Sequence, residues 1–229
     1  MKVAIIVFPG SNCDRDAFVA VESILGSTPL LVWHKDTKIP DVDLIILPGG
    51  FSYGDYLRAG AMAANSPILN EVVRKAKKGI HILGICNGFQ ILTECKLLPG
   101  ALIRNSGISF ICRDVDLRVE NTESKFLHKY KSNQIIRIPI AHHDGNYIAD
   151  EKTLNDLEEN NLIALRYCSP SGEIDNNTNP NGSDRNIAGI LNKNLNVLGM
   201  MPHPERLIDK KLGGVDGKAL FEGLFEAMS

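Results

Sequence analysis

Short apolar runs alternate with helical segments through the first half of the chain, and no other feature constrains the fold as strongly. Four runs have the length of a strand: residues 2–8, 30–33, 43–47 and 80–85. Apolar residues at helical spacing, with stop signals at Gly26 and Gly79, predict helices at residues 14–25, 67–79 and 88–95. Such alternation is typical of a mainly parallel central sheet flanked by helices.

The second half adds shorter elements and no sign of a domain boundary. Extended segments are predicted at residues 107–119, 135–142, 162–168 and 187–191, and a final helix at 216–228. A stretch rich in Ser, Asn, Gly and Pro, residues 169–186, is expected to be a loop. A chain of 229 residues without repeats or linkers suits one α/β domain over residues 1–229.

The overall composition argues against a nucleic-acid partner and a membrane span, and it indicates the cellular compartment. A formal net charge of -2 gives no excess of Lys and Arg for binding a nucleic acid, and no apolar stretch approaches the roughly 20 residues that span a membrane. The apolar N-terminal run stops at Pro9-Gly10 without a cleavage site, so we expect a first strand rather than a signal peptide. Five cysteines without CxxC spacing indicate neither a disulfide framework nor a zinc knuckle, and they favour a cytoplasmic protein.

The most informative segment for chemistry is Gly84-Ile85-Cys86-Asn87-Gly88, which follows a predicted strand and precedes a predicted helix. Glycines two residues to either side of a cysteine relieve crowding in a tight turn, as in a nucleophile elbow. The turn is expected to leave the Cys86 side chain exposed, where the helix N-terminus favours thiolate over thiol. The other four cysteines are expected to be small buried side chains.

A thiol nucleophile needs a base, and the base needs a group that orients it. The segment Pro202-His203-Pro204-Glu205 supplies both, because the prolines restrict the backbone and an extended chain would point Glu205 to the same side as His203. The imidazole would share the thiol proton and later deliver it to the leaving group. Backbone N–H groups of the Gly49-Gly50 turn and of Asn87 are expected to form an oxyanion hole, with a plain tight turn as the alternative for the glycines.

These motifs resemble those of the class I (triad) glutamine amidotransferases, whose α/β domain has a flavodoxin-like core. Within that class, three further segments are similar to the glutaminase subunits of phosphoribosylformylglycinamidine synthase: Phe8–Asp14, Pro48–Arg58 and Asn179–Ser183. The likeness runs from residue 2 to the C-terminus.

The resemblance implies that Cys86 attacks L-glutamine to form a thioester, with His203 and Glu205 completing the triad. It also implies main-chain oxyanion donors and a glutamine-binding residue: Gly50, Phe51 and Asn87 for the former, and Gln90 for the latter. Ammonia would pass to a large synthetase subunit, which uses ATP and Mg²⁺ to make formylglycinamidine ribonucleotide in purine biosynthesis. A small accessory subunit would complete the complex, and this chain itself would bind no cofactor and no metal.

One segment departs from the family pattern. Members of the family read Ala-His-Gly-Glu-Gly where this chain has Ala141-His142-His143-Asp144-Gly145. The departure changes the contacts expected of that loop. A zinc site on its two histidines and aspartate is not expected, because adjacent histidines on an extended chain face opposite sides and a further ligand is lacking.

Other functions are compatible with parts of this pattern. A stand-alone cysteine hydrolase of γ-glutamyl peptides could share the fold and the triad, and a regulatory subunit could have lost its activity. The non-enzymatic alternative is a redox-sensing or chaperone-like α/β protein with an exposed cysteine. That class requires neither His203 and Glu205 nor Gln90, and an intact triad argues against lost activity, so the glutaminase is favoured.

Overall fold

The computed structural model describes residues 1–228, and its core is one nine-stranded sheet with the order β2-β1-β3-β4-β11-β10-β9-β6-β7. A separate two-stranded sheet pairs β5 (Ala101–Ile103) with β8 (Asn146–Ile148). Because the main sheet draws strands from both halves of the sequence, the described residues form a single α/β domain. Within them, no helix is long and apolar enough to cross a membrane.

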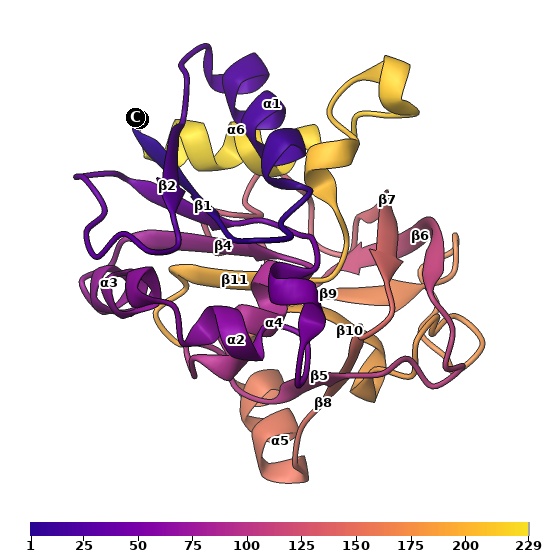
Figure 1. The fold of residues 1–229 in the computed structure, drawn as a ribbon. Coiled ribbons are helices and arrows are strands. Elements are labelled where there is room, and N and C mark those ends of the chain that lie inside the picture. The colour runs from indigo at the N-terminus through magenta and orange to yellow at the C-terminus, as the bar shows by residue number, and fades with distance from the viewer. Residues whose placement is uncertain (229) are drawn as a thin grey trace.

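Parallel strands make up one half of the main sheet. In spatial order they are β2 (Leu30–Trp33), β1 (Val3–Val7), β3 (Leu44–Leu47), β4 (His81–Ile85) and β11 (Val197–Met200). The helices on one face are α1 (Asp14–Leu25) and α6 (Lys218–Ala227), and those on the other are α2 (Ala61–Ala64), α3 (Pro67–Lys77) and α4 (Asn87–Glu94) (Figure 1). Burial on both faces explains why most of these strands are continuous apolar runs.

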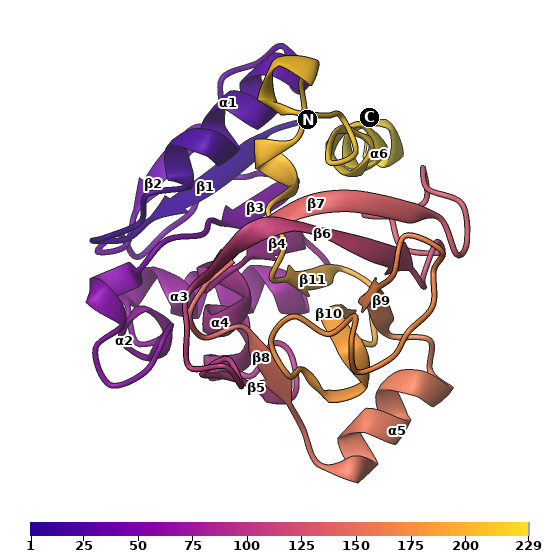
Figure 2. The same ribbon diagram turned by 90° about the vertical axis from the view of Figure 1, so that its right-hand side faces the viewer.

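Antiparallel strands extend the sheet beyond β11. They are β10 (Ile187–Leu191), β9 (Ile163–Cys168), β6 (Ile111–Val119) and β7 (Ile135–His142). The last two form a long hairpin at the sheet edge, seen as two neighbouring ribbons in Figure 2. The remaining elements are α5 (Glu151–Glu159) and four 3-10 turns: η1 (Ser52–Asp55), η2 (Asp184–Asn186), η3 (Pro204–Arg206) and η4 (Lys210–Leu212).

The predicted α/β fold with a mainly parallel central sheet is confirmed, and the predicted helices and strands are present with small shifts at their ends. Five elements were not predicted from the sequence: β5, β8, β11, α2 and α5. Except for α5, these elements have only three or four residues, too few to show a period. Helix α5 has a weak apolar period, because it buries only Leu154 and Leu157. The residue that could have indicated it is the N-cap Asp150, whose carboxylate accepts the Thr153 N–H at 2.7 Å.

The strand order brings the three chemical motifs together. Strands β3, β4 and β11 are parallel neighbours, with Leu47 beside Gly84 and Ile85 beside Met200. The Gly-Gly turn, Cys86 and His203 each follow the carboxyl end of one of these strands. Open parallel sheets bind their ligands at this edge, so the candidate site lies where the fold class places one.

Candidate active site

Cys86 occupies the turn between β4 and α4 in a conformation that L-residues rarely adopt. Its backbone angles are φ 50° and ψ -105°, outside the helix and strand regions. The Cys86 N–H donates to Met200 O at 2.7 Å, and the Phe89 and Gln90 N–H groups donate to Cys86 O at 2.9 and 3.2 Å. This tight strand-to-helix turn is the elbow that the glycine spacing predicts.

The glycines that flank Cys86 are required by close packing. A Cβ on Gly88 would lie 1.9 Å from Leu47 O, and a Cβ on Gly84 would lie 2.4 Å from Leu92 Cδ1. Both distances are far below van der Waals contact, so a side chain at either position would push α4 away from β3 and β4. The two glycines therefore determine where the first turn of α4 lies relative to Cys86.

The Cys86 side chain is buried, with 4% of the residue exposed, so the expectation of an exposed thiol was wrong. Its Sγ lies 3.7 Å from the backbone oxygen of Ala141 on β7. This strand belongs to the antiparallel half of the sheet and covers the elbow from the side. The local motif carries no information about a strand that comes 50 residues later in the chain.

His203 and Glu205 form a buried pair next to the elbow. His203 Nδ1 lies 2.6 Å from Glu205 Oε1, and each side chain is 1% exposed. The His203 N–H donates to Pro139 O at 2.8 Å, which ties this segment to β7. The predicted pairing is present, although the 3-10 turn η3 produces it rather than an extended chain.

The environment of His203 favours the charged ring. Burial opposes the imidazolium, but the Glu205 carboxylate and the thiols of Cys86 and Cys13 raise the pKa of His203 well above its ordinary value. His203 Nε2 makes no hydrogen bond within the described residues, so it is the ring atom left to exchange a proton. The pair thus has the features of a general acid and its orienting carboxylate.

The predicted oxyanion donors differ in their availability. The Asn87 N–H lies in the first turn of α4, where helix amides have no intrahelical acceptor. Gly50 has φ 136°, and a Cβ there would lie 2.8 Å from Asn12 N, so both its conformation and its surroundings require glycine. The Phe51 N–H donates to Gly10 O at 3.1 Å and is therefore occupied in this conformation.

Gln90 connects α4 to the loop after β7. Its Nε2 donates to Asp144 O at 2.6 Å, and its Oε1 accepts from Asn87 Nδ2 at 2.8 Å. Asn87 Oδ1 in turn accepts the Ser52 N–H at 3.1 Å. This chain of amide contacts joins the loop after Gly50, the helix and the loop after β7 around the elbow.

A cluster that no sequence motif indicates lies beside the His203–Glu205 pair. Arg206 Nη2 donates to Cys13 Sγ at 2.9 Å, and Arg206 Nε donates to Asp16 Oδ2 at 3.1 Å. Cys13, His203 and Glu205 could each offer a metal one ligand atom within 4.8 Å of the others. However, the guanidinium already contacts the sulfur and Glu205 already binds His203, so the contacts describe a hydrogen-bonded support for the pair.

The segment that departs from the family pattern has defined contacts. Arg104 Nε binds Asp144 Oδ1 at 2.9 Å, and Arg104 Nη1 lies 3.1 Å from His143 Nε2. The preceding His142 is buried and lies 3.1 Å from Asn105 Oδ1 through its Nδ1. The two histidines therefore meet different partners, and the substituted residues form an ion-paired loop at the rim of the site.

Asp55 is an unusual acid near the same rim. Its Oδ1 lies 3.4 Å from Asn87 Nδ2. Partial burial, and secondly the nearby Asp144 carboxylate, raise the pKa of Asp55 to about 6.

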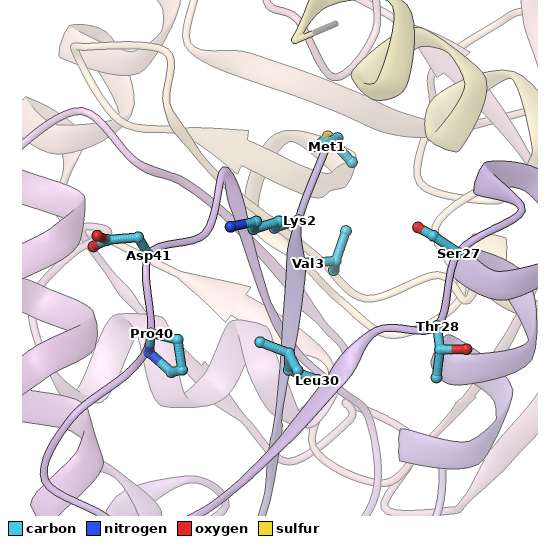
Figure 3. A pocket seen from close by; sticks show the side chains of 8 residues that line it. All are labelled: Met1, Lys2, Val3, Ser27, Thr28, Leu30, Pro40 and Asp41. Carbon is cyan, nitrogen blue, oxygen red and sulfur yellow. The ribbon is translucent and has the colours of Figure 1, made fainter.

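A surface pocket lies at the other end of the parallel strands. Figure 3 shows the residues that line it: Met1, Lys2, Val3, Ser27, Thr28, Leu30, Pro40 and Asp41. Most of them lie at or before the amino ends of β1 and β2 or in the turns beside them, whereas Cys86 follows the carboxyl end of β4. This pocket contains none of the predicted site residues.

Comparisons with known proteins agree with a cysteine-dependent active site at the carboxyl edge of the parallel strands. A model of the CobB/CobQ-like glutamine amidotransferase domain matches residues 1–213. The phosphoribosylformylglycinamidine synthase subunit PurQ of Zymomonas mobilis is 58% identical, and that of Rhodospirillum rubrum is 54% identical, each over 100% of both chains. The chain belongs to the CobB/CobQ-like glutamine amidotransferases, among the PurQ subunits.

Solved structures extend the likeness to the fold. A chain in the structure of PurLQS from Thermotoga maritima is 46% identical, with a TM-score of 0.87 over 100% of this chain and 99% of that one. A glutamine amidotransferase from the same organism, at 17% identity and a TM-score of 0.57, shares the fold alone. The predicted activity is confirmed at this level: the protein is a glutamine amidotransferase, the glutaminase subunit of phosphoribosylformylglycinamidine synthase.

Proposed function

We propose that this amidotransferase hydrolyses L-glutamine through a thioester on Cys86, with His203 and Glu205 as its partners. The observation that supports the proposal is the buried 2.6 Å contact between His203 Nδ1 and Glu205 Oε1. Both residues follow β11, the strand that pairs with β4 and so lies next to the Cys86 elbow. A carboxylate on Nδ1 leaves Nε2 of the same ring for proton exchange with Cys86.

The proposed reaction has two stages, formation of the thioester and its hydrolysis. The Cys86 sulfur attacks the γ-carbonyl carbon, and His203 delivers the thiol proton to the amide nitrogen, which leaves as ammonia. Water then attacks the thioester, losing a proton to His203, and glutamate is released with the thiol restored. The Asn87 and Gly50 N–H groups would stabilise the oxyanion, and loss of one such donor typically costs about 10²–10³ in rate.

Phe51 and Gln90 take less direct parts in this proposal. The Phe51 N–H could join the oxyanion hole only after its 3.1 Å bond to Gly10 O breaks. Gln90 would line the glutamine pocket from α4, where its side chain already orients the loop at Asp144.

We further propose that the ammonia passes to a large synthetase subunit, which binds ATP and Mg²⁺ and makes formylglycinamidine ribonucleotide. A small accessory subunit would complete the assembly. Support for a partner comes from exposed apolar side chains around the site: Phe51, Tyr56 and Leu57 on one loop, and Ile108 and Phe110 on another. The Phe51 and Phe110 rings lie 6.4 Å apart, so the two loops form one apolar rim. We place the reaction in the cytoplasm, because a thiol nucleophile must stay reduced.

The mechanism is tested with the complex of this chain and its synthetase subunit. Cys86→Ala should abolish ammonia release from glutamine, while product should still form from added ammonium. Cys112→Ala, which changes an exposed thiol outside the site, is the matched control and should keep full activity. Glutamine-dependent turnover in the Cys86→Ala complex would overturn the thioester mechanism.

Dependence on a partner separates this amidotransferase from a stand-alone γ-glutamyl hydrolase, the alternative that the sequence left open, because such an enzyme would use the same triad. It should turn over γ-glutamyl peptides without a partner. Turnover of glutamine that rises by orders of magnitude when the synthetase subunit is added would favour the amidotransferase.

A further inference from the structure

A second histidine beside the catalytic pair has a ring nitrogen without a partner. His142 ends β7 and is 2% exposed. Its Nε2 is buried and makes no hydrogen bond to any part of residues 1–228. Buried polar atoms are nearly always paired, so an unpaired one at a catalytic site points to a group that arrives with the substrate.

The hydrogen bonds of Asn105 determine the tautomer of this ring. Asn105 Nδ2 donates to Ser109 O at 2.9 Å and to His142 O at 3.0 Å, which identifies the other amide atom as the acceptor Oδ1. That oxygen accepts the Gly145 N–H at 3.0 Å and lies 3.1 Å from His142 Nδ1. Nδ1 must therefore carry the proton and donate it, which leaves Nε2 as a lone-pair acceptor.

The ring is neutral and closely packed. Burial, and secondly the charge of His203, lower the pKa of His142 to about 4, so it carries no charge near pH 7. A Cβ on Gly145 would lie 2.3 Å from His142 Cε1, so the loop backbone contacts the ring directly and leaves it little room to turn.

The same strand contacts both the nucleophile and its partner. Ala141, the residue before His142, places its carbonyl oxygen 3.7 Å from Cys86 Sγ. Pro139 O, two residues earlier, accepts the His203 N–H at 2.8 Å. His142 is the next residue of this strand, and its ring lies close enough to His203 for the charge of that ring to lower its pKa.

We propose that His142 Nε2 accepts an N–H hydrogen bond from the γ-amide nitrogen of glutamine while that nitrogen leaves as ammonia. The inference rests on the proposed function and adds a residue that recognises the leaving group. The amide nitrogen carries two hydrogens, and His203 supplies the third, so the departing ammonia always has an N–H to donate. An atom that only accepts can hold this group and does not protonate it, and it repels the carboxylate oxygens of the product glutamate.

The test compares two leaving groups in the complex with the synthetase subunit. Glutamate γ-methyl ester forms the same thioester as glutamine, but its leaving oxygen carries no hydrogen until His203 protonates it. His142→Leu should lower kcat/KM for glutamine by about 10- to 30-fold and that for the ester by less than threefold. The ratio kcat/KM is used because it reports formation of the thioester and excludes the common hydrolysis step.

Two further variants separate recognition from structure. His142→Gln offers an amide oxygen as acceptor and should recover most of the preference for glutamine. His143→Leu removes the neighbouring ring, which contacts Arg104 and not Asn105. This variant should leave kcat/KM unchanged for both glutamine and the ester. Equal losses on glutamine and ester in His142→Leu, or no loss on either, would overturn the inference.

A spectroscopic measurement covers the case in which the leucine variant does not fold. In the Cys86→Ala complex with ¹⁵N-labelled histidine, saturating glutamine should shift the His142 Nε2 resonance toward that of a hydrogen-bonded acceptor. An unmoved resonance at saturation would overturn the inference as well. Failure of the wild-type complex to release ammonia from glutamine would instead refute the proposed function itself.

Discussion

At the scale of single residues, Cys86 is both the proposed nucleophile and a residue with a strained backbone. A non-glycine residue at φ 50° costs about 1–2 kcal/mol, and here the cost is offset by three backbone hydrogen bonds around the turn. The strained turn places Cys86 at the carboxyl edge of the sheet, where the proposed mechanism needs its thiol.

This strain leads to a prediction about stability. Cys86→Gly should be more stable to urea than Cys86→Ala by about 1 kcal/mol, because glycine adopts this conformation without a Cβ clash. Both variants should be inactive on glutamine, so the comparison isolates the backbone term. An alanine variant as stable as the glycine variant would show that the turn is not strained.

Asp55 allows a prediction about pH. A carboxyl group with a pKa of about 6 in the folded protein, above its ordinary 3.8, binds more protons folded than unfolded between those values. Its contribution therefore destabilises the fold as the pH rises from about 4 to 6. We expect Asp55→Asn to raise the free energy of unfolding at pH 7 by about 1 kcal/mol, after allowance for solvent screening, and to change it little at pH 4.

Urea unfolding at the two pH values measures this difference. Glu173→Gln, at an exposed carboxylate in the loop after β9, is the control for the loss of one negative charge. A stabilisation by Asp55→Asn that is the same at pH 4 and pH 7 would rule out the raised pKa as its cause.

At the scale of elements, the contact between α4 and β3 depends on a missing side chain. The distance of 1.9 Å that would separate a Cβ at position 88 from Leu47 O cannot be relieved by turning a side chain, since the obstacle is backbone. We expect Gly88→Ala to destabilise the protein by about 3 kcal/mol or more, or to prevent folding.

Gly79→Ala is the matched control for this prediction. Gly79 has φ 90°, and a Cβ added there would meet no atom within 4 Å, so the substitution should cost only backbone strain, about 1 kcal/mol. Thermal unfolding of both variants checks the difference. Equal losses at the two glycines would contradict the packing account of the elbow.

Elements also show where sequence periodicity stops being informative. Strand β3 and helix α1 were predicted almost to the residue, because continuous apolar runs and a left-handed Gly26 mark their limits. Strand β11 was missed, since four residues between a turn and Met201-Pro202 have no measurable period. Its insertion beside β4 is nevertheless what brings His203 to Cys86.

At the scale of the whole molecule, an exposed apolar rim surrounds a site whose thiol is buried. Leu57 is 91% exposed on the loop that begins at the candidate oxyanion residues, yet Cys86 is almost inaccessible. A partner seated on this rim could shield the site from water and receive ammonia directly.

Leu57→Asp should therefore weaken binding of the synthetase subunit by about tenfold or more, because a charge would be buried in an apolar contact. Leu212→Asp is the control, since Leu212 is also an exposed leucine, 56% accessible, but lies near α1 and α6. Calorimetric titration measures both affinities. Unchanged binding by the Leu57 variant would place the interface elsewhere.

The sequence by itself determined the elbow, the Pro-His-Pro-Glu segment, the Gly-Gly turn and the alternation of strands and helices. Each is set within a few residues, by glycine packing, proline restriction or apolar period, and so each can be recognised without a fold. Only the tertiary structure decided that Cys86 is covered by β7, that Arg206 contacts Cys13 beside His203, and that Asn105 fixes the tautomer of His142. Those contacts join residues 37 to 193 positions apart, and they depend on strand order and register, which no local pattern encodes.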